Sequence, residues 1–368
     1  MALAESTAEG AGAATVAPNL ALIEATLQRL WGEAVKVTQM RRLTAGATKQ
    51  TWQFEAILRG VAQPLILQTL PPAKLLSAHN ETRRTLTPEQ DADICALAGA
   101  HGVPVPELVL RLDGSQGIGQ GLITRFVAGE TLAPKILRDA RYAKARERIT
   151  AQCAQALADV HRIAPAKAAF LPVKGAAAQW QDNRAQVDAS GIRHPALEWG
   201  LRWIEERLAE HANPAPVPVH GDFRLGNFIV NDDGLAAVID WELAHLGDAM
   251  QDLAWLCLRT WRFGGPNEVA GFGRRSELYA AYERASGIPV NEDRVFFWEM
   301  ACQVRWAVMC LGMGLGLGGA IGAQSSGARG GAPAQLPVIS LEHRLIGRRM
   351  EEPLWDMIQL AKTRADAI

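Results

Sequence analysis

The sequence predicts an α+β protein of two lobes, a small N-terminal lobe with a five-stranded antiparallel sheet and a larger, mostly helical C-terminal lobe. Strand-like segments dominate residues 35–126, and helical patterns dominate from residue 142 onward. The chain has 368 residues, of which 48% are hydrophobic. A chain of this length and composition is better accommodated by two lobes than by a single core.

The N-terminal lobe is predicted to cover residues 19–127. Residues 19–31 carry apolar side chains at helical spacing and open it. In the second strand Trp52, Phe54 and Ala56 alternate with polar neighbours, which is typical of a half-buried strand. The five predicted strands cover residues 35–43, 52–58, 64–70, 108–112 and 121–126. A helix with proline in its first turn is expected at residues 88–100.

The C-terminal lobe is predicted to cover residues 128–368, after a crossing segment at residues 127–131. Apolar residues recur at helical spacing along several of its segments, which predicts that this lobe is mostly helical. The predicted helices cover residues 149–163, 196–211, 246–259, 274–286, 291–312 and 340–364. Within the first of them, we interpret His161 as a core histidine with its hydrogen bonds satisfied.

Residues 1–18 are rich in small residues and lack both a basic run and an apolar core, so they predict a disordered tail rather than a signal peptide. Residues 300–323 have the length of a membrane span, but Gln303 and Arg305 interrupt them and six glycines crowd the second half. We therefore expect a buried helix that ends in a mobile Gly/Ala-rich loop at about residues 314–336.

The net charge of −1 gives no field that attracts nucleic acid or a membrane. Five scattered cysteines without a CxxC pair indicate neither zinc nor a disulfide framework. These features predict a cytoplasmic protein without nucleic-acid or membrane partners.

The most informative segment is HGDFRLGN at residues 220–227, followed by IDWE at 239–242. Asp222 and Asn227 are expected on a tight loop. The apolar runs on either side of an Asp-Gly turn at 233–234 then predict a hairpin. Its pairing returns Asp240 to the height of Asn227, so three oxygen-bearing side chains converge.

This convergence suggests phosphoryl transfer. The carboxylate of Asp222 can orient and deprotonate an attacking hydroxyl, while the oxygens of Asn227 and Asp240 can hold Mg²⁺. Asp and Asn are also common turn formers, so each residue alone has a structural interpretation. The three together in this order favour a catalytic site. Arg224 is placed to engage phosphate or acceptor charge, or to form a structural salt bridge.

Two neighbours of this segment are interpreted as supports. His220 is expected to brace the loop rather than to carry protons. Asp252 is expected near the start of a helix, where the helix dipole favours a carboxylate, and it is also placed to brace the catalytic loop.

The strings HGDFRLGN, VIDWELAHLGD and DLAWL resemble the aminoglycoside phosphotransferase family, also called the choline-kinase-like phosphotransferase enzyme family. Within it they are most similar to a branch related to kinase domains found beside acyl-CoA dehydrogenases. The resemblance runs from about residue 20 to the C-terminus and is strongest over residues 217–256. It implies a protein-kinase-like two-lobe fold and ATP as phosphoryl donor.

The resemblance also implies a nucleotide site in the N-terminal lobe. The turn that contains Thr44, Gly46, Ala47 and Thr48 would cover the phosphates, and backbone groups from Thr124 to Phe126 would meet the adenine; the alternative for the latter segment is an ordinary edge strand.

The basic position of the third strand falls on Gln68, and its acidic helix partner falls near Asp91, so neither matches the pattern cleanly. Lys49 is a candidate to supply the missing charge, and its alternative is a solvated strand lysine.

The sequence therefore predicts an ATP- and Mg²⁺-dependent kinase that phosphorylates an alcohol group of a small molecule. Arginines interleaved with tryptophans favour an anionic or apolar acceptor, and the resemblance points to a hydroxyacyl-CoA. The arginines are Arg259, Arg262, Arg274 and Arg275. The alternative, motivated by Gln68 and Asp91, is a weak or inactive pseudokinase that acts as a nucleotide-binding or scaffold protein.

Overall fold

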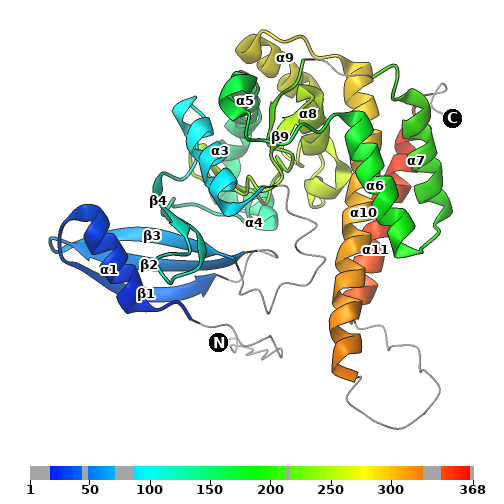
Figure 1. Ribbon diagram of the computed structural model, residues 1–368. Helices are drawn as coiled ribbons and strands as arrows, with labels where there is room; N and C mark the ends of the chain where they lie inside the picture. Colours follow the sequence, from blue (N-terminus) through cyan, green and yellow to red (C-terminus); the bar gives the residue numbers. More distant parts are fainter. Residues whose placement is uncertain (1–16, 44–48, 71–85, 212–214, 326–340, 365–368) are drawn as a thin grey trace, which may run out of the picture. The chain divides into compact units, whose positions relative to one another are not determined.

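The computed structural model describes residues 17–43, 49–70, 86–211, 215–325 and 341–364, and within helices it leaves out the side chains of residues 314–325 and 341–349. The chain divides into two compact units. The first comprises Met1–Leu76 and Leu110–Ile123, and the second comprises Ser77–Val109 and Thr124–Ile368. Each unit is built around its own secondary structure (Figure 1).

The first unit is built on a five-stranded sheet in the order β1-β2-β3-β5-β4, which confirms the predicted sheet. Strands β1, β2 and β3 pair antiparallel. Arg59 and Gly60, at the β2–β3 turn, both have positive φ, as a two-residue hairpin turn requires. The strands are β1 (Val35–Leu43), β2 (Gln50–Leu58), β3 (Val61–Thr69), β4 (Leu108–Asp113) and β5 (Gln120–Arg125).

One face of this sheet carries the core of the first unit. Trp52, Phe54 and Leu65 are buried, as the alternating pattern predicts. Helix α1 (Leu20–Trp31) packs along β1. Asn19 caps the helix, because its side chain accepts hydrogen bonds from the backbone N–H groups of residues 21 and 22.

The second unit is mostly helical and encloses one continuous hydrophobic core. Two small antiparallel sheets lie within it, one pairing β6 (Val217–Val219) with β9 (His245–Gly247) and one pairing β7 (Phe228–Asn231) with β8 (Gly234–Val238). Its α-helices are α3 (Pro88–Ala100), α4 (Ala133–Arg138), α5 (Ala143–His161), α6 (Ala176–Ser190), α7 (Pro195–Arg207), α8 (Ala249–Cys257), α9 (Arg275–Ser286), α10 (Glu292–Ser325) and α11 (Leu341–Ala361). The predicted helical character of this part is confirmed.

Helix α10 is longer than the sequence predicts. We expect a loop from about residue 314, but the backbone is helical through Ser325. Helices α10 and α11 run side by side (Figure 1). Packing between helices can outweigh the weak helix propensity of glycine, which was the basis of the expected loop. The rest of that predicted loop, like most of the predicted tail at residues 1–18, lies outside the described residues.

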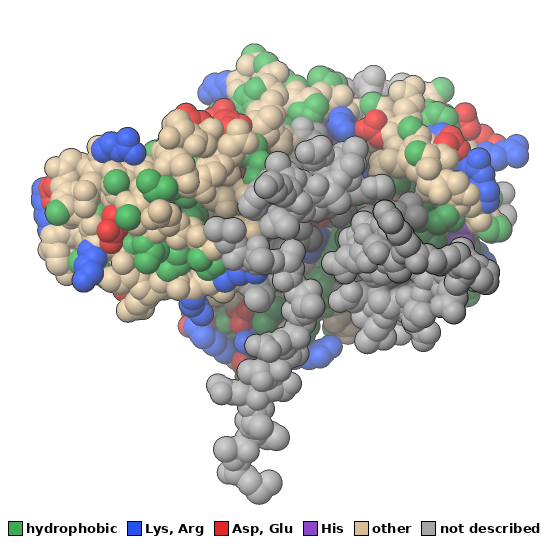
Figure 2. Space-filling view, turned by 60° about the horizontal axis from the view of Figure 1, so that its bottom comes forward, with side chains coloured by type: hydrophobic (Ala, Val, Ile, Leu, Met, Phe, Trp, Pro, Cys, Tyr) green, Lys and Arg blue, Asp and Glu red, His purple; other side chains and the backbone are tan. Residues whose placement is uncertain are grey.

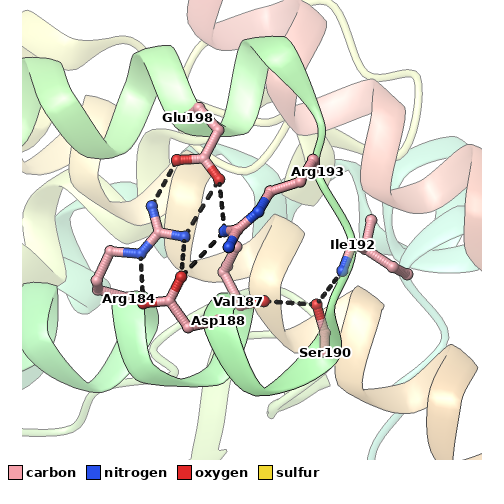
Figure 3. Close-up of polar contacts among 7 residues, drawn as sticks. All are labelled: Arg184, Val187, Asp188, Ser190, Ile192, Arg193 and Glu198. Atoms are coloured by element: carbon pink, nitrogen blue, oxygen red, sulfur yellow. Dashed lines mark hydrogen bonds and ion pairs between the residues drawn. The ribbon is translucent and has the colours of Figure 1, made fainter.

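Helix α6 is the longest helix that the pattern misses, because few of its side chains are buried. Ion pairs connect it to α7, as Figure 3 shows. Arg184 contacts Asp188 at 2.7 Å and Glu198 at 2.5 Å, and Arg193 contacts the same two carboxylates. Exposed pairs of this kind contribute about 0–1 kcal/mol each. They add polar contacts between α7 and a helix, α6, whose sequence shows no strong apolar stripe.

The coloured surface in Figure 2 carries basic and acidic side chains close to one another, in keeping with the net charge of −1. Within the described ranges, no helix combines the length and the apolar character needed to cross a membrane.

Candidate active site

The loop between β6 and β7 carries Asp222, whose carboxylate is held by three donors. Its Oδ1 atom accepts from Arg224 Nε and from Trp255 Nε1, both at 2.9 Å. Its Oδ2 atom accepts from Asn227 Nδ2 at 2.6 Å. The residue as a whole is 9% exposed. The carboxylate is thus fixed in one orientation at the edge of solvent.

The tight turn before Asp222 depends on Gly221. This residue has a φ of +77°, a conformation that glycine adopts without a steric penalty. A Cβ atom at this position would lie 2.5 Å from the carbonyl oxygen of Leu243. Only glycine therefore permits both this backbone conformation and the close approach of the two segments.

The β7–β8 hairpin brings Asp240 to Asn227. Phe228 pairs with Val238, and the N–H of Ile239 donates to the carbonyl oxygen of Asn227 at 2.9 Å. Asp240 is therefore one residue beyond the level of Asn227. Its φ of +68° lies in the left-handed region, which is uncommon for a non-glycine residue and tends to occur at functional sites.

Asn227 and Asp240 are the two residues here that could hold a metal ion. Asn227 Nδ2 donates both to the backbone oxygen of Asp222 at 3.0 Å and to its carboxylate. Both amide hydrogens are therefore engaged, and the amide oxygen remains to meet a cation. The Asn227 amide oxygen and the Asp240 carboxylate are hard oxygen ligands of the kind that Mg²⁺ prefers.

Asp252, in the first turn of α8, braces the candidate catalytic loop at residues 220–227. Its Oδ2 atom accepts from the backbone N–H of His220 at 2.8 Å, and its Oδ1 atom accepts from Gly221 N–H at 2.9 Å. Burial acts to raise the pKa of this carboxyl group. The hydrogen bond and charge of His161 and the contacts with His220 outweigh burial, so the pKa lies below its usual value. Asp252 thus fills both roles that the sequence suggests.

The bracing continues into the core. His161 Nε2 lies 3.4 Å from Asp252 Oδ2, and His161 Nδ1 lies 2.7 Å from the hydroxyl of Tyr282 on α9. His161 is therefore the satisfied core histidine that the sequence predicts. Tyr282 was not predicted, because it is 121 residues away from His161 in the sequence.

The His220 side chain connects the catalytic loop to the hairpin. Its Nδ1 atom accepts from the N–H of Asp222 at 3.1 Å, so Nε2 carries the proton and donates to the carbonyl oxygen of Ile239 at 3.3 Å. Burial lowers the pKa of His220, although the surrounding carboxylates oppose the shift. A neutral imidazole thus ties Asp222 to the residue before Asp240, which is a bracing role.

Two arginines stack on tryptophans next to this loop. The Arg224 guanidinium lies 4.4 Å from the ring centroid of Trp261, which belongs to a 3₁₀ turn, η4 (Arg259–Arg262). The Arg305 guanidinium of α10 lies 5.1 Å from the ring of Trp255 and donates to Gly221 O at 3.0 Å. No sequence pattern marks Arg305 as a site residue, because it only interrupts an apolar stretch.

The residues expected to hold the nucleotide are distributed as follows. Thr44, Gly46, Ala47 and Thr48 lie outside the described residues. Thr124, in the second unit, is buried in β5, and Phe126 follows that strand half-buried. In the first unit, Gln68 on β3 pairs with Thr51. Lys49 directly precedes β2, so it lies at the end of the sheet where β3 finishes.

The fold and this loop define the class of kinase-like phosphotransferases. Residues 39–288 match the model of the phosphotransferase enzyme family, which covers more than half of the sequence. The chain belongs to this family.

Similar proteins agree with that assignment. A candidate aminoglycoside phosphotransferase of Ralstonia eutropha has the same fold, with a TM-score of 0.68, 19% identity and coverage of 94% of this chain and 99% of its own. The GDP complex of an aminoglycoside 2′-phosphotransferase-IIIa aligns with a TM-score of 0.57, 13% identity and coverage of 92% and 99%. Acyl-CoA dehydrogenase family member 10 of Mus musculus is 29% identical over 215 residues, which are 55% of this chain and 19% of that protein.

The curated acyl-CoA dehydrogenase relatives are much longer than the region they share with this chain. The chain spans between 19% and 32% of their lengths.

Proposed function

We propose that the protein transfers the γ-phosphate of ATP, with Mg²⁺, to a hydroxyl group of a small molecule. The observation that carries this proposal is the position of Asp222, held by three donors beside Asn227 and next to the hairpin that delivers Asp240. Membership of the phosphotransferase family and the GDP complex of a structural neighbour support nucleotide-dependent phosphoryl transfer.

Asp222 is the proposed general base. An ionised carboxylate offers about four positions for hydrogen-bond donors. Three of them are taken by Arg224, Trp255 and Asn227. The remaining position accepts the proton of the acceptor hydroxyl as that oxygen attacks the γ-phosphorus, and the bond from phosphorus to the bridging oxygen of ADP breaks.

Asn227 Oδ1 and the Asp240 carboxylate are the proposed ligands of Mg²⁺. When bound, the ion supplies positive charge that offsets the phosphate charge. Arg224, which pairs with Asp222, adds a second positive charge to the same region.

For the nucleotide, we propose contacts from the 44–48 turn and from the backbone at Thr124 and Phe126. Gln68 is neutral at the position where related kinases carry a lysine or arginine. We propose that Lys49 provides this positive charge instead.

For the acceptor, we propose an anionic or apolar alcohol. Arg224 lies on the 220–227 loop and Arg305 donates to it, and positive charge at this loop disfavours a polycation. A hydroxyacyl thioester of coenzyme A is anionic and partly apolar, and the curated relatives carry acyl-CoA dehydrogenase names.

A second candidate function is a nucleotide-binding scaffold with little turnover, which the neutral Gln68 favours. The two functions are separated by measuring ATP-induced stabilisation and ATP consumption with Mg²⁺ and with a chelator, across a panel of alcohols. Mg²⁺-dependent consumption that requires an alcohol supports the phosphotransferase. Stabilisation by ATP without consumption on the whole panel supports the scaffold.

A further inference from the structure

A group of hydrogen-bond donors lies beside the catalytic loop and does not donate to the Asp222 carboxylate. It consists of Arg305 and Trp306 on α10 and Trp261 on η4, and we call it the donor cluster. The rings of Trp261 and Trp306 are 4.8 Å apart, and Trp306 also packs edge-on against Trp255. The cluster is therefore continuous with the tryptophan that donates to the Asp222 carboxylate.

Two donors of this cluster lack an acceptor. Among the described residues, Trp261 Nε1 and Trp306 Nε1 are buried without a hydrogen-bond partner, and Trp261 as a whole is only 4% exposed. A buried donor left unpaired costs about as much free energy as a lost hydrogen bond, so native proteins rarely tolerate it. The arrangement therefore calls for a group that brings acceptor atoms.

Arg305 also has more N–H donors than acceptors. Its guanidinium has five N–H groups, and the structure gives it one acceptor, the carbonyl oxygen of Gly221, together with the face of Trp255. No carboxylate in the described part of the chain forms an ion pair with it. Arg294, on the same helix, pairs with Asp248 in contrast. Arg305 is thus a half-buried positive charge to which no described residue supplies an anion.

Arg305 is also close to the reacting group. It binds the carbonyl of Gly221, the residue directly before Asp222. Trp255 contacts both side chains, since its ring lies under Arg305 and its Nε1 atom donates to Asp222. A molecule that reaches the Asp222 carboxylate can therefore place an acidic group against Arg305.

We propose that Arg305, assisted by the N–H groups of Trp306 and Trp261, binds an anionic group of the acceptor and makes the site selective for anionic alcohols. This inference rests on the proposed phosphotransferase function and adds the residue that selects the acceptor by its charge. A carboxylate or phosphate brings the acceptor oxygens that these donors lack, and a guanidinium pairs with either group in a planar, two-bond geometry. An ammonium group would meet the guanidinium with like charge.

The test uses three probes of equal chain length: an ω-hydroxy acid, the corresponding alkanol and the ω-amino alcohol. Their affinities are measured from the rise in Tm with probe concentration, on the full chain with Mg²⁺ and a non-hydrolysable ATP analogue. The wild-type chain is expected to bind the hydroxy acid at least about tenfold more tightly than either other probe, because one charge-assisted bond contributes about that factor.

Four variants locate the effect. Arg305→Gln is expected to lose about tenfold or more of its affinity for the hydroxy acid and to keep its affinity for the alkanol. Arg305→Lys should retain part of the preference, because it keeps the charge but not the planar donor pair. Trp306→Phe keeps an aromatic ring without the N–H group and should lose a smaller factor. Arg202→Gln, on an exposed arginine of α7, is the matched control and should change nothing.

The inference is overturned if Arg305→Gln, folded as judged by its own Tm, discriminates among the probes as the wild type does. It is also overturned if the wild type binds the amino alcohol as tightly as the hydroxy acid. Phosphate transfer is measured in parallel on the same probes with ATP. Transfer without anion preference rejects the role of Arg305 alone. Anion preference without transfer to any probe, or to any compound of a pool of alcohols, sugars and hydroxyacyl-CoAs, rejects the phosphotransferase function and leaves Arg305 as an anion-binding residue.

Discussion

The side-chain amide of Asn227 donates to the carboxylate of Asp222 over 2.6 Å and to its backbone oxygen over 3.0 Å. The proposed metal ligand and the proposed base therefore fix each other. The same contact leaves the Asn227 amide oxygen free of the Asp222 carboxylate. In the proposed mechanism, one amide group therefore couples the position of the base to that of the metal ligand.

Asn227→Asp tests this coupling. The substitution preserves shape but replaces the donor with a carboxylate facing another carboxylate, and like charges at this distance disfavour ionisation of one of them. We expect kcat to fall by about tenfold or more, and the free energy of unfolding to fall by about 1–3 kcal/mol at neutral pH. Asn231→Asp in the hairpin turn is the control, because that side chain only accepts from Asp233 N–H. Equal kinetics for both variants would show that the amide contact is dispensable.

Asp252→Asn tests the bracing of the catalytic loop. An amide offers one acceptor oxygen where the carboxylate serves the N–H groups of both His220 and Gly221. One fully buried N–H then lacks an acceptor, and the free energy of unfolding is expected to drop by about 1–3 kcal/mol, with a loss of kcat. Urea denaturation measures the first quantity. Asp188→Asn, on an exposed carboxylate of α6, should cost less than about 1 kcal/mol.

Stability is expected to fall in mild acid because of His245. Burial, followed by the charge of Arg305, lowers its pKa from 6.5 to about 4. The unfolded chain therefore binds a proton at a higher pH than the folded chain, so this contribution is complete above pH 6.5 and is lost as the pH falls toward 4. The contribution of His245 to the free energy of unfolding is about 3 kcal/mol.

His245→Gln removes that titration, so its unfolding free energy should depend less steeply on pH across this range than that of the wild type. The lowered pKa of His220 acts in the same direction and is left in both chains. Identical slopes in urea unfolding series at several pH values would contradict the assignment to His245.

Gly221→Ala tests the close approach behind Asp222. Two costs add at this position: positive φ for a residue with a Cβ atom, about 1–2 kcal/mol, and a contact of 2.5 Å with the carbonyl oxygen of Leu243. Gly191→Ala is a matched control, because Gly191 has a φ of +67° and open space around its added Cβ. We expect Gly221→Ala to destabilise the protein more than Gly191→Ala and to reduce kcat. If the two variants are equally stable and active, the close approach has no consequence.

Lys49→Ala tests whether this lysine compensates for the neutral Gln68. Loss of a charge-assisted contact with phosphate is worth about 1.5–3 kcal/mol, so the KM for ATP should rise by about tenfold or more. Lys36→Ala, on an exposed lysine of the neighbouring strand β1, should leave the KM unchanged. Unaltered ATP affinity in Lys49→Ala would eliminate this role.

The sequence predicts those features that are local in the chain. Alternation in residues such as Trp52 and Phe54 is a short-range pattern, and so is the spacing of Asp222, Asn227 and Asp240 around one hairpin. The bracing role of Asp252 could also be predicted, because Asp252 follows closely in the same motif.

Features that depend on distant segments were missed or altered. Tyr282 completes the brace through His161 from another helix, and Arg305 reaches Gly221 from α10. Helix α6 contacts α7 through ion pairs and carries no strong apolar stripe. These contacts are set by tertiary packing, which a pattern within one segment does not record.

The most direct test of the central claim is a mass-spectrometric search for phosphorylated products. Pooled alcohols, sugars and hydroxyacyl-CoAs are incubated with the protein, ATP and Mg²⁺, with Asp222→Ala as the control. We predict a phosphate-sized mass gain on at least one hydroxyl compound that disappears with Asp222→Ala and with chelation of Mg²⁺. A product that forms equally with Asp222→Ala, or ATP binding with no phosphorylated compound in any pool, would contradict the account.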